Sequence, residues 1–372
     1  MSPAPAAAGG APSLCAMLAV PGALDTPTGG YGYAARLLDE ADGVGLALRH
    51  LPLPGGFPTP SPAEIDATAA RLAATPPGRP ILVDGLALGA LPARAIRGAA
   101  GPVTALCHHP LGLETGLPEA LSARLLASER AALALCAGVI TTSRTTADLV
   151  QRLFDIPDER LAVARPGTDR PASRRSQRHR VEGPVHILSV GSLTRRKGHD
   201  TLLAALGRLG ALDWRLTIVG AVPDDSQAET LKTLARTPPL RDRVEIRGPV
   251  ERAALEHLYT GADIFALASR YEGYGMAFAE AMAHGLPVVG CRAGAVAEAT
   301  DGGARLVPPD DPPALAAALG PLIADAEARH RAAAEAQRAA LRLPSWRDTA
   351  GAVRAAISAW TAPPAETLGR AP

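Results

Sequence analysis

Aromatic residues are scarce in this sequence: Phe, Trp and Tyr together make up 3% of its 372 residues. Proteins that bind single-stranded nucleic acid stack the bases on aromatic rings, so the composition argues against that class. The formal net charge is only +1, which lacks the positive excess of a general nucleic-acid binder. Hydrophobic residues make up 47% of the chain, and this content and length are enough for two domains of ordinary size.

Cysteine is also rare. The four cysteines form no C-x-x-C pair and no Cys/His cluster with the spacing of a zinc site, which argues against structural zinc. Each lies in an apolar run, so the sequence predicts buried free thiols in a reducing, cytoplasmic environment. They are Cys15, Cys107, Cys136 and Cys291.

No long apolar run predicts a transmembrane helix. The first charged residue is Asp25, so residues 1–24 have some likeness to a signal peptide. This segment lacks a basic start, however, and four prolines and a glycine pair interrupt it. We therefore expect a disordered tip followed by a strand at Leu14–Val20.

Short apolar runs alternate with helical patterns through the first half of the chain. This alternation predicts βαβ units, and hence a parallel sheet with helices on both faces. In such sheets ligands bind beyond the carboxyl ends of the strands. The predicted strands are Leu14–Val20, Val44–Leu48, Ile81–Val83, Val103–Leu106, Val139–Thr142 and Leu161–Ala164, and the clearest helices are Ala63–Ala74 and Pro118–Cys136.

Two features follow strands of this half. Gly30, Gly32 and Ala35 match G-x-G-x-x-A, but they do not follow the strand directly and no acid ends the second strand, which disfavours NAD binding. His108 and His109 follow the fourth strand. Adjacent side chains on an extended chain diverge, so a metal pair is disfavoured. Two roles remain open for these histidines: acid–base catalysis, or a structural hydrogen bond within the loop.

An arginine-rich stretch without apolar periodicity, residues 171–184, predicts a linker between residues 1–170 and 185–343. A basic stripe of this kind can touch an anionic membrane weakly, and a solvated linker is the alternative. After Pro344, the pattern Ser345-x-x-Asp348 resembles a capping box and predicts a last helix, 345–361, that packs back on the first domain.

A basic loop follows the predicted strand Val185–Val190. Gly191 and Gly198 bracket three consecutive cations, Arg195, Arg196 and Lys197. The loop is not a Walker A motif, because the GK[ST] sequence is absent. A basic surface loop is the alternative to an anion site. Asp200, just after the loop, is predicted to cap the helix that starts with Thr201 and Leu202.

Residues 270–290 combine two acids with a helix start. Glu272 lies in a glycine-broken turn, good helix formers begin at Met276, and Glu280 lies in the second turn of that helix. The uncapped N–H groups of a helix start favour an anion. Two carboxylates flanking it can hold hydroxyl groups on either side, as a nucleotide sugar requires. A solvated pair of glutamates is the alternative.

This stretch resembles the E-x7-E segment of the retaining glycosyltransferases of family 4, which have the GT-B fold: two Rossmann-like α/β domains whose parallel sheets face a central cleft. The resemblance implies that Glu272 lies beside the donor sugar and that Glu280 binds the nucleotide ribose. It implies that Arg196 and Lys197 bind the diphosphate and stabilise the departing nucleotide. The surrounding positions that match are Gly275, Ala281, Met282, Gly285, Pro287 and Val288.

The resemblance also implies an acceptor-binding first domain and a donor-binding second domain. Gly30 would face the donor phosphate, Gly275, Met276 and Ala277 would form the helix start at that phosphate, and His109 would lie near the sugar or acceptor. The implied reaction moves a sugar, as a hexosyltransferase does, from a nucleoside diphosphate to a hydroxyl of a glycan, lipid-linked or small-molecule acceptor. It would retain the anomeric configuration without a metal or other cofactor, and no D-x-D cation motif is present.

Three alternatives differ in reaction class. A nucleotide-sugar epimerase of the same fold needs no separate acceptor, so product analysis without acceptor distinguishes it. A non-catalytic nucleotide-sugar binding protein would bind the donor without turnover. A dehydrogenase would bind NAD(P). No nucleic-acid partner is expected.

Overall fold

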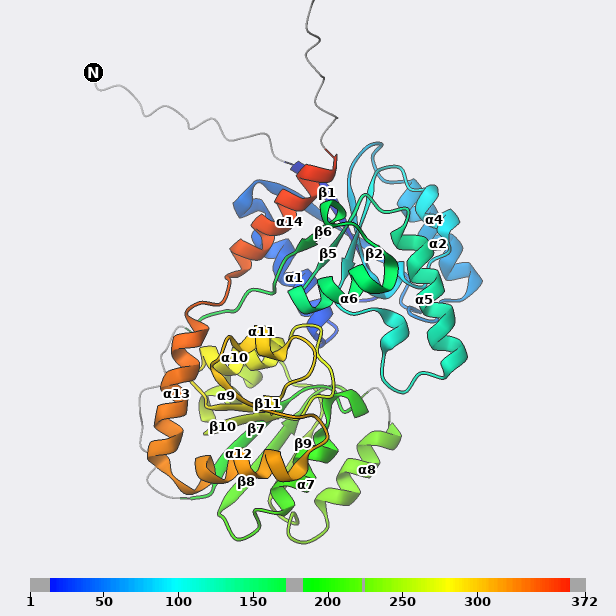
Figure 1. The fold of residues 1–372 in the computed structure, drawn as a ribbon. Coiled ribbons are helices and arrows are strands. Elements are labelled where there is room, and N and C mark those ends of the chain that lie inside the picture. The colour runs from blue at the N-terminus through cyan, green and yellow to red at the C-terminus, as the bar shows by residue number, and fades with distance from the viewer. Residues whose placement is uncertain (1–13, 172–182, 223–224, 362–372) are drawn as a thin grey trace, which may run out of the picture.

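The computed structural model describes residues 14–171, 183–222 and 225–361 (Figure 1). The arginines of the predicted linker, between residues 172 and 182, lie outside the described residues, as does the predicted tip before residue 14. Two lobes make up the molecule, and each is built on a six-stranded sheet. None of the helices within the described ranges combines the length and the apolar character needed to cross a bilayer.

The first sheet has the strand order β2-β1-β3-β4-β5-β6, and every neighbouring pair is parallel. Its strands are β1 (Leu14–Pro21), β2 (Leu46–Leu53), β3 (Ile81–Asp84), β4 (Val103–Cys107), β5 (Gly138–Thr141) and β6 (Leu161–Val163). The connecting helices are α1 (Gly29–Ala41), η1 (Asp42–Val44), α2 (Pro62–Ala73), α3 (Gly85–Leu88), α4 (Ala93–Arg97), η2 (Leu111–Leu113), α5 (Glu119–Leu133), α6 (Arg144–Phe154) and η3 (Asp158–Arg160).

The second sheet has the order β12-β11-β10-β7-β8-β9 and is also parallel. Its strands are β7 (Val185–Val190), β8 (Trp214–Val219), β9 (Val244–Arg247), β10 (Ile264–Leu267), β11 (Val288–Cys291) and β12 (Ala304–Val307). Its helices are η4 (Arg195–Lys197), α7 (His199–Gly207), α8 (Asp225–Ala235), α9 (Arg252–Gly261), α10 (Met276–Ala283), α11 (Val296–Thr300), α12 (Pro312–Ala324) and α13 (Ala326–Ala340). The predicted pair of Rossmann-like sheets is thus confirmed.

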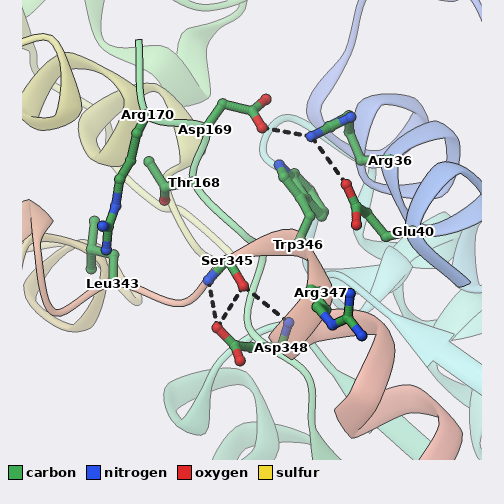
Figure 2. A pocket seen from close by; sticks show the side chains of 10 residues that line it. All are labelled: Arg36, Glu40, Thr168, Asp169, Arg170, Leu343, Ser345, Trp346, Arg347 and Asp348. Atoms are coloured by element: carbon green, nitrogen blue, oxygen red, sulfur yellow. Dashed lines mark hydrogen bonds and ion pairs between the residues drawn. The ribbon is translucent and has the colours of Figure 1, made fainter. Parts of the chain in front are cut away.

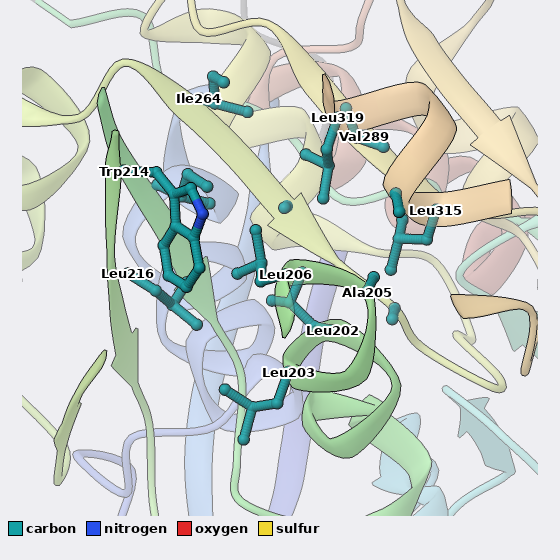
Figure 3. Packing of buried hydrophobic residues seen from close by; sticks show 14 of the residues in the cluster. Leu202, Leu203, Ala205, Leu206, Trp214, Leu216, Ile264, Val289, Leu315 and Leu319 are labelled. Carbon is teal, nitrogen blue, oxygen red and sulfur yellow. The ribbon is translucent and has the colours of Figure 1, made fainter. Parts of the chain in front are cut away.

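Apolar side chains on both faces of each sheet form its cores. In the second lobe, Leu202 and Leu206 lie one turn apart on α7, so both point to the same side of that helix. They pack with Trp214 of β8 and with Leu315 and Leu319 of α12 (Figure 3). This packing holds α7 against the sheet, and with it the basic loop that leads into α7.

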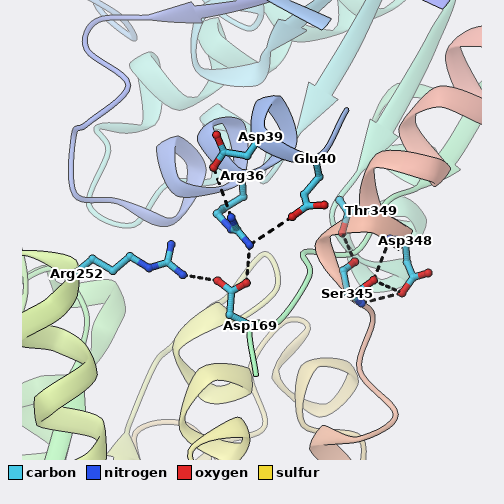
Figure 4. A network of polar contacts seen from close by, with 8 residues as sticks. All are labelled: Arg36, Asp39, Glu40, Asp169, Arg252, Ser345, Asp348 and Thr349. Carbon is cyan, nitrogen blue, oxygen red and sulfur yellow. Dashed lines mark hydrogen bonds and ion pairs between the residues drawn. The ribbon is translucent and has the colours of Figure 1, made fainter. Parts of the chain in front are cut away.

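The last helix, α14 (Trp346–Thr361), belongs in sequence to the second lobe but packs on the first, against α1 and β5. Ser345 and Asp348 form the predicted reciprocal cap (Figure 4). Ser345 Oγ accepts the Asp348 N–H at 3.2 Å, and Asp348 Oδ2 accepts the Ser345 N–H at 2.8 Å. The Trp346 ring meets Tyr33 edge-on at 5.6 Å, and the Trp360 indole donates to the Glu159 carbonyl at 2.8 Å. Both tryptophans therefore anchor the helix.

The chain crosses between the lobes twice at one place, and a charged network ties that junction together. Asp169 accepts from Arg36 of α1 at 2.6 Å and from Arg252 of α9, so it joins both lobes (Figure 4). Thr168 also donates its N–H to the Pro344 carbonyl at 2.9 Å, linking the two crossings. A pocket of about 460 Å³ opens beside them (Figure 2).

Three local predictions are wrong. The second strand runs over Leu46–Leu53 and not 44–48, because its parallel pairing with β1 continues through Leu53. Asp200 does not cap α7; Gly198 is the N-cap, and the Asp200 carboxylate binds Arg270 at 2.8 Å. Cys15 is exposed, whereas the other three cysteines are buried as predicted. Side chains alternate along a strand, and Cys15 lies on the opposite face from its buried neighbour Ala16.

Glu129 of α5 is buried below the loop that follows β4. Burial raises the pKa of its carboxyl from about 4.5 to about 7, although hydrogen bonds from Leu111 and Gly112 partly oppose the shift. Between these two pKa values the folded protein binds more protons than the unfolded chain. Stability is therefore expected to fall as pH rises through this window, by at most about 3 kcal/mol.

Glu129→Gln tests this expectation, because glutamine keeps the shape without the charge. Urea unfolding at pH 5 and pH 8 should show the variant gaining about 1–3 kcal/mol relative to the wild type at the higher pH. Glu119→Gln, an exposed change at the start of the same helix, is the control. Equal pH dependence in the Glu129 variant and the wild type would contradict the assignment.

Candidate active site

The carboxyl ends of the two sheets meet at a narrow backbone contact. Gly273, just after β10, lies so close to the loop after β4 that a Cβ on it would stand 2.1 Å from the His108 carbonyl oxygen. The Thr146 hydroxyl of α6 donates to the Gly273 carbonyl at 3.1 Å. Only glycine fits this approach, so the glycine of the E-x7-E turn brings the two lobes together.

Glu272 is the centre of a charged cluster. Its Oε1 lies 2.7 Å from Lys197 Nζ, and its Oε2 lies 3.7 Å from the Arg196 guanidinium. The Ser269 hydroxyl donates to Oε1 at 2.5 Å. Burial acts to raise the pKa of the Glu272 carboxyl, but the two cations outweigh it and hold the pKa below its ordinary value. The buried side chain is therefore a carboxylate at neutral pH.

The backbone of the basic loop is shaped by close packing. Gly198 has a φ of 63°, and a Cβ there would stand 1.9 Å from the Ala268 carbonyl oxygen. Arg270 braces the same loop: its backbone N–H donates to the Arg196 carbonyl at 2.8 Å, and its guanidinium binds Asp200 and Asp310, both at 2.8 Å. Arg196 and Lys197 are thus held on an ordered turn.

Two helix starts face each other across the cleft. Gly275, with a φ of 108°, is the N-cap of α10, and no side chain caps either α10 or α1. A Cβ on Gly29 of α1 would lie 3.7 Å from Met276 Sδ, and one on Gly30 would lie 3.6 Å from His108 Cδ2. Uncapped N–H groups of both helices, with their positive dipole ends, therefore point into the region beside the basic loop, a setting that favours an anion.

Glu280 lies on another side of α10 from this cluster. The Tyr259 hydroxyl of α9 donates to its Oε2 at 2.9 Å. Burial is the main cause that raises the pKa of the Glu280 carboxyl, and the hydrogen bond from Tyr259 and the charge of Arg252 act against it. The half-buried carboxylate is thus available beside α9 for a hydroxyl-bearing ligand.

His109 packs its ring on Tyr271 at 4.4 Å, between the lobes. Burial is the main cause that lowers the pKa of the imidazole, although the charge of Glu114 and a hydrogen bond with the Leu113 backbone act against it, so the ring is neutral near pH 7. Beside it, Arg196 Nε binds Glu114 of the first lobe at 3.0 Å. His108 points elsewhere, with Nε2 3.3 Å from Asp84 Oδ2.

The structure therefore gathers most of the predicted site residues in one place. His109, Glu272, Arg196 and Lys197 form one cluster, with Gly30, Gly275, Met276 and Ala277 at the two helix starts next to it. Three further contacts involve residues that the sequence reasoning missed: Asp84, Tyr259 and Glu298. Glu298 of α11 accepts from the N–H groups of Arg144 and Thr145, at 2.9 and 3.3 Å, and so caps α6 from the other lobe.

A signal existed for Asp84, since an acid at the carboxyl end of a predicted strand lies where ligands bind. Tyr259 and Glu298 carried no such signal. Glu298 lies 154 residues from the helix that it caps. Its role depends on how the two lobes are arranged.

Family models match both halves of the chain. The model for glycosyl transferases group 1 matches residues 184–325, and that for glycosyltransferase family 4 matches residues 37–170. D-inositol 3-phosphate glycosyltransferase of Xylanimonas cellulosilytica is 35% identical over 62% of this chain and 58% of its own length. Mannosylfructose-phosphate synthase of Agrobacterium fabrum is 32% identical over 41% of this chain and 37% of its own. The chain thus matches little more than half of the first relative and little more than a third of the second.

Solved structures extend the likeness over nearly the whole chain. Anabaena HepE, crystallised with UDP and glucose, has a TM-score of 0.73 at 19% identity, over 93% of this chain and 99% of that one. Sucrose-phosphate synthase of Thermosynechococcus elongatus also has a TM-score of 0.73, at 20% identity, over 90% of this chain and 96% of that one. At this identity they establish the fold. The two family models place the chain among the group 1 glycosyltransferases of family 4, and the solved structures show the GT-B fold.

Proposed function

We propose that the protein is a retaining, metal-independent glycosyltransferase that moves a sugar from a nucleoside diphosphate to a hydroxyl acceptor. In this proposal residues 1–170, with the helix at 345–361, bind the acceptor, and residues 185–343 bind the donor. The observation that carries it is the cluster of Glu272, Lys197 and Arg196 beside two uncapped helix starts. Structures of one neighbour in fold, Anabaena HepE, contain UDP or UDP-glucose, which favours a nucleotide-sugar donor.

The diphosphate would lie at the starts of α1 and α10, near Gly30 and Met276. Lys197 and Arg196 would then turn from Glu272 to the phosphate oxygens, which frees the Glu272 carboxylate for the donor sugar. As the sugar–phosphate bond breaks, negative charge grows on the departing diphosphate, and fixed cations and helix dipoles stabilise it. These groups would replace a divalent cation in stabilising the charge on the diphosphate.

The acceptor would attack the donor sugar on the same face from which the nucleotide departs, so the anomeric configuration is retained. A donor phosphate oxygen would help to remove the acceptor proton, and no covalent bond would form between the sugar and a side chain. The neutral His109 ring can accept a hydrogen bond from a sugar hydroxyl or donate one to it. The backbone contact at Gly273 would help to exclude water from the bond that breaks.

Glu280 is proposed to hold the ribose hydroxyls of the nucleotide. A hydrogen bond to a charged group contributes about 1.5–3 kcal/mol, so Glu280→Ala is expected to weaken nucleoside diphosphate binding about 10- to 100-fold. The fold should survive, because the Tyr259 hydroxyl also reaches the Ala277 carbonyl, at 3.4 Å. Titration calorimetry measures the change, and Glu335→Ala, an exposed change on α13, is the control. Equal affinities in both variants would remove the ribose assignment.

The test of the reaction is incubation with nucleotide sugars and hydroxyl acceptors, with and without EDTA. We expect acceptor-dependent release of nucleoside diphosphate, no effect of EDTA, and an anomeric configuration by NMR that matches the donor. Inversion, or loss of activity in EDTA, would contradict the proposal. Sugar isomerisation without acceptor would indicate the epimerase instead, and binding without turnover would indicate a nucleotide-sugar binding protein.

A further inference from the structure

The start of α6 in the first lobe is capped from both lobes. Its own lobe supplies Ser143, whose hydroxyl accepts the Thr146 N–H at 2.9 Å. The N–H groups of Arg144 and Thr145 come earlier in the helix and have no carbonyl within it to bind. Both bind Glu298 of the second lobe: Oε2 accepts them at 2.9 and 3.3 Å, and Oε1 lies 3.1 Å from Arg144 N. The cap is therefore complete only when the two lobes meet.

The short helix that carries Glu298 is bonded to the backbone of Glu272. The Ala295 N–H, at the start of α11, donates to the Glu272 carbonyl at 2.9 Å. A Cβ on Gly294 would stand 2.2 Å from the same oxygen, so the approach is close. Glu298 follows Ala295 by three residues, within one helical turn. A contact that holds Glu298 in place thus also holds the turn that carries the Glu272 carboxylate.

The start of α6 also binds that turn directly. The Thr146 hydroxyl donates to the Gly273 carbonyl at 3.1 Å, and Gly273 in turn lies against the His108 carbonyl. The second lobe therefore meets α6 at two points, Gly273 and Glu298. Both connect to Glu272, because Gly273 follows it in the chain and α11 binds its carbonyl. The docking of α6 thus sets where Glu272 lies relative to the two-histidine loop.

This contact differs from the ion pair between Arg196 and Glu114, which also crosses the cleft. Arg196 is assigned to the donor diphosphate, so it would leave Glu114 when the donor binds. Glu298 and the start of α6 hold no part of the proposed donor, so their contact can persist in the loaded enzyme. A carboxylate at a helix start forms charge-assisted hydrogen bonds and faces the positive end of the helix dipole, which strengthens the contact.

We propose that Glu298 is a positioning residue for sugar transfer: its carboxylate caps α6 across the cleft and so fixes Glu272 against the loop that carries His109. Opening of the lobes to admit substrates breaks this cap, and closure remakes it. A closed cleft excludes water, so the contact favours transfer to the acceptor over hydrolysis of the donor. This inference rests on the proposed function, since it concerns the same reaction.

Hydrolysis of the donor is the side reaction that reports on closure. The water oxygen bonds to the anomeric carbon, the bond from that carbon to the diphosphate breaks, and the water proton passes to the departing nucleoside diphosphate. Transfer differs only in that an acceptor hydroxyl takes the place of water. The ratio of free sugar to transfer product, measured with the nucleotide sugar and acceptor that react in the incubations above, therefore compares an open cleft with a closed one.

Glu298→Gln removes the charge and keeps the shape of the side chain. One of its two terminal groups is an NH₂ donor, so it cannot accept both helix N–H groups as the carboxylate does. We expect a kcat for transfer about tenfold lower. The ratio of hydrolysis to transfer should rise at least about fivefold. The Kd for the nucleoside diphosphate should change by less than about threefold, because Arg196, Lys197 and Glu280 all lie in the second lobe.

Two controls separate positioning from stability. Glu335→Gln removes an exposed charge from α13 and should behave as the wild type. Ser143→Ala removes the cap that α6 receives from its own lobe, so it should lower the melting temperature without raising the ratio of hydrolysis to transfer. An unchanged ratio in Glu298→Gln, or an equal rise in Ser143→Ala, would overturn the proposal.

Failure of this proposal differs from failure of the proposed function. If the wild type transfers sugar and Glu298→Gln matches it in kcat and in the ratio, Glu298 has no positioning role and the proposed function stands. If the wild type neither transfers nor hydrolyses any nucleotide sugar, the proposed function fails, and the role of Glu298 fails with it.

Discussion

Replacing Lys197 with alanine is expected to reduce sugar transfer by about 10²- to 10³-fold, the usual effect of removing one fixed group that stabilises developing negative charge. The Lys197 side chain is 15% exposed, and its ammonium lies 2.7 Å from Glu272 Oε1. Arg196, at 3.7 Å from the same carboxylate, would be its only remaining cation within the described cluster. Steady-state assays should show most of the loss in kcat, because the charge on the departing diphosphate develops in the transition state.

The chain supplies a matched control for this change. Lys232 of α8 pairs with Glu229 at the same distance, 2.7 Å, but its side chain is 45% exposed and lies away from the cleft. Lys232→Ala therefore removes a lysine–glutamate pair of equal length without touching the site. Its activity should equal that of the wild type. If both variants transfer sugar at the wild-type rate, the role of Lys197 is wrong.

Among glycine-to-alanine substitutions in the basic loop, Gly198→Ala should cause the largest loss of stability. A left-handed backbone costs an alanine about 1–2 kcal/mol. The new Cβ would also meet the Ala268 carbonyl oxygen at 1.9 Å, which forces the loop or β10 to shift. Overpacking of this kind typically costs about 1–3 kcal/mol more. Urea unfolding should thus show a total loss of about 2–5 kcal/mol.

Gly78→Ala separates the two contributions. Gly78 has a φ of +72°, close to the +63° of Gly198, but a Cβ there meets nothing within 4 Å. The backbone cost is therefore the same, and the steric clash is missing. We expect a loss of about 1–2 kcal/mol for Gly78→Ala. Equal losses at the two glycines would contradict the tight approach of the basic loop to β10.

The parts of the site that lie close together in the sequence could be predicted. Glu272, the glycine turn and the start of α10 occupy one short stretch, and Arg196 and Lys197 occupy another, so spacing and resemblance were enough to place them. The fold was predictable for a similar reason. Apolar runs alternating with helical patterns allow few arrangements other than parallel sheets.

Contacts between distant residues could not be predicted in this way. The carboxylate of Asp200 looked like a helix cap, but Arg270 binds it because the two loops after β7 and β10 lie side by side. Glu298 caps a helix of the other lobe, which no local pattern signals. Such roles depend on the tertiary arrangement, and local sequence preferences yield to it.

The most direct test of the central claim is the melting temperature of the protein with a panel of nucleoside diphosphates, compared with the corresponding nucleosides. A ligand that binds only the folded state raises the melting temperature by mass action, about 2.7 kcal/mol of stabilisation at a hundredfold excess over Kd. The account predicts a rise with at least one nucleoside diphosphate, little with the nucleoside, and a smaller rise in Lys197→Ala. No rise with any nucleoside diphosphate would contradict a donor site between the basic loop and the two helix starts.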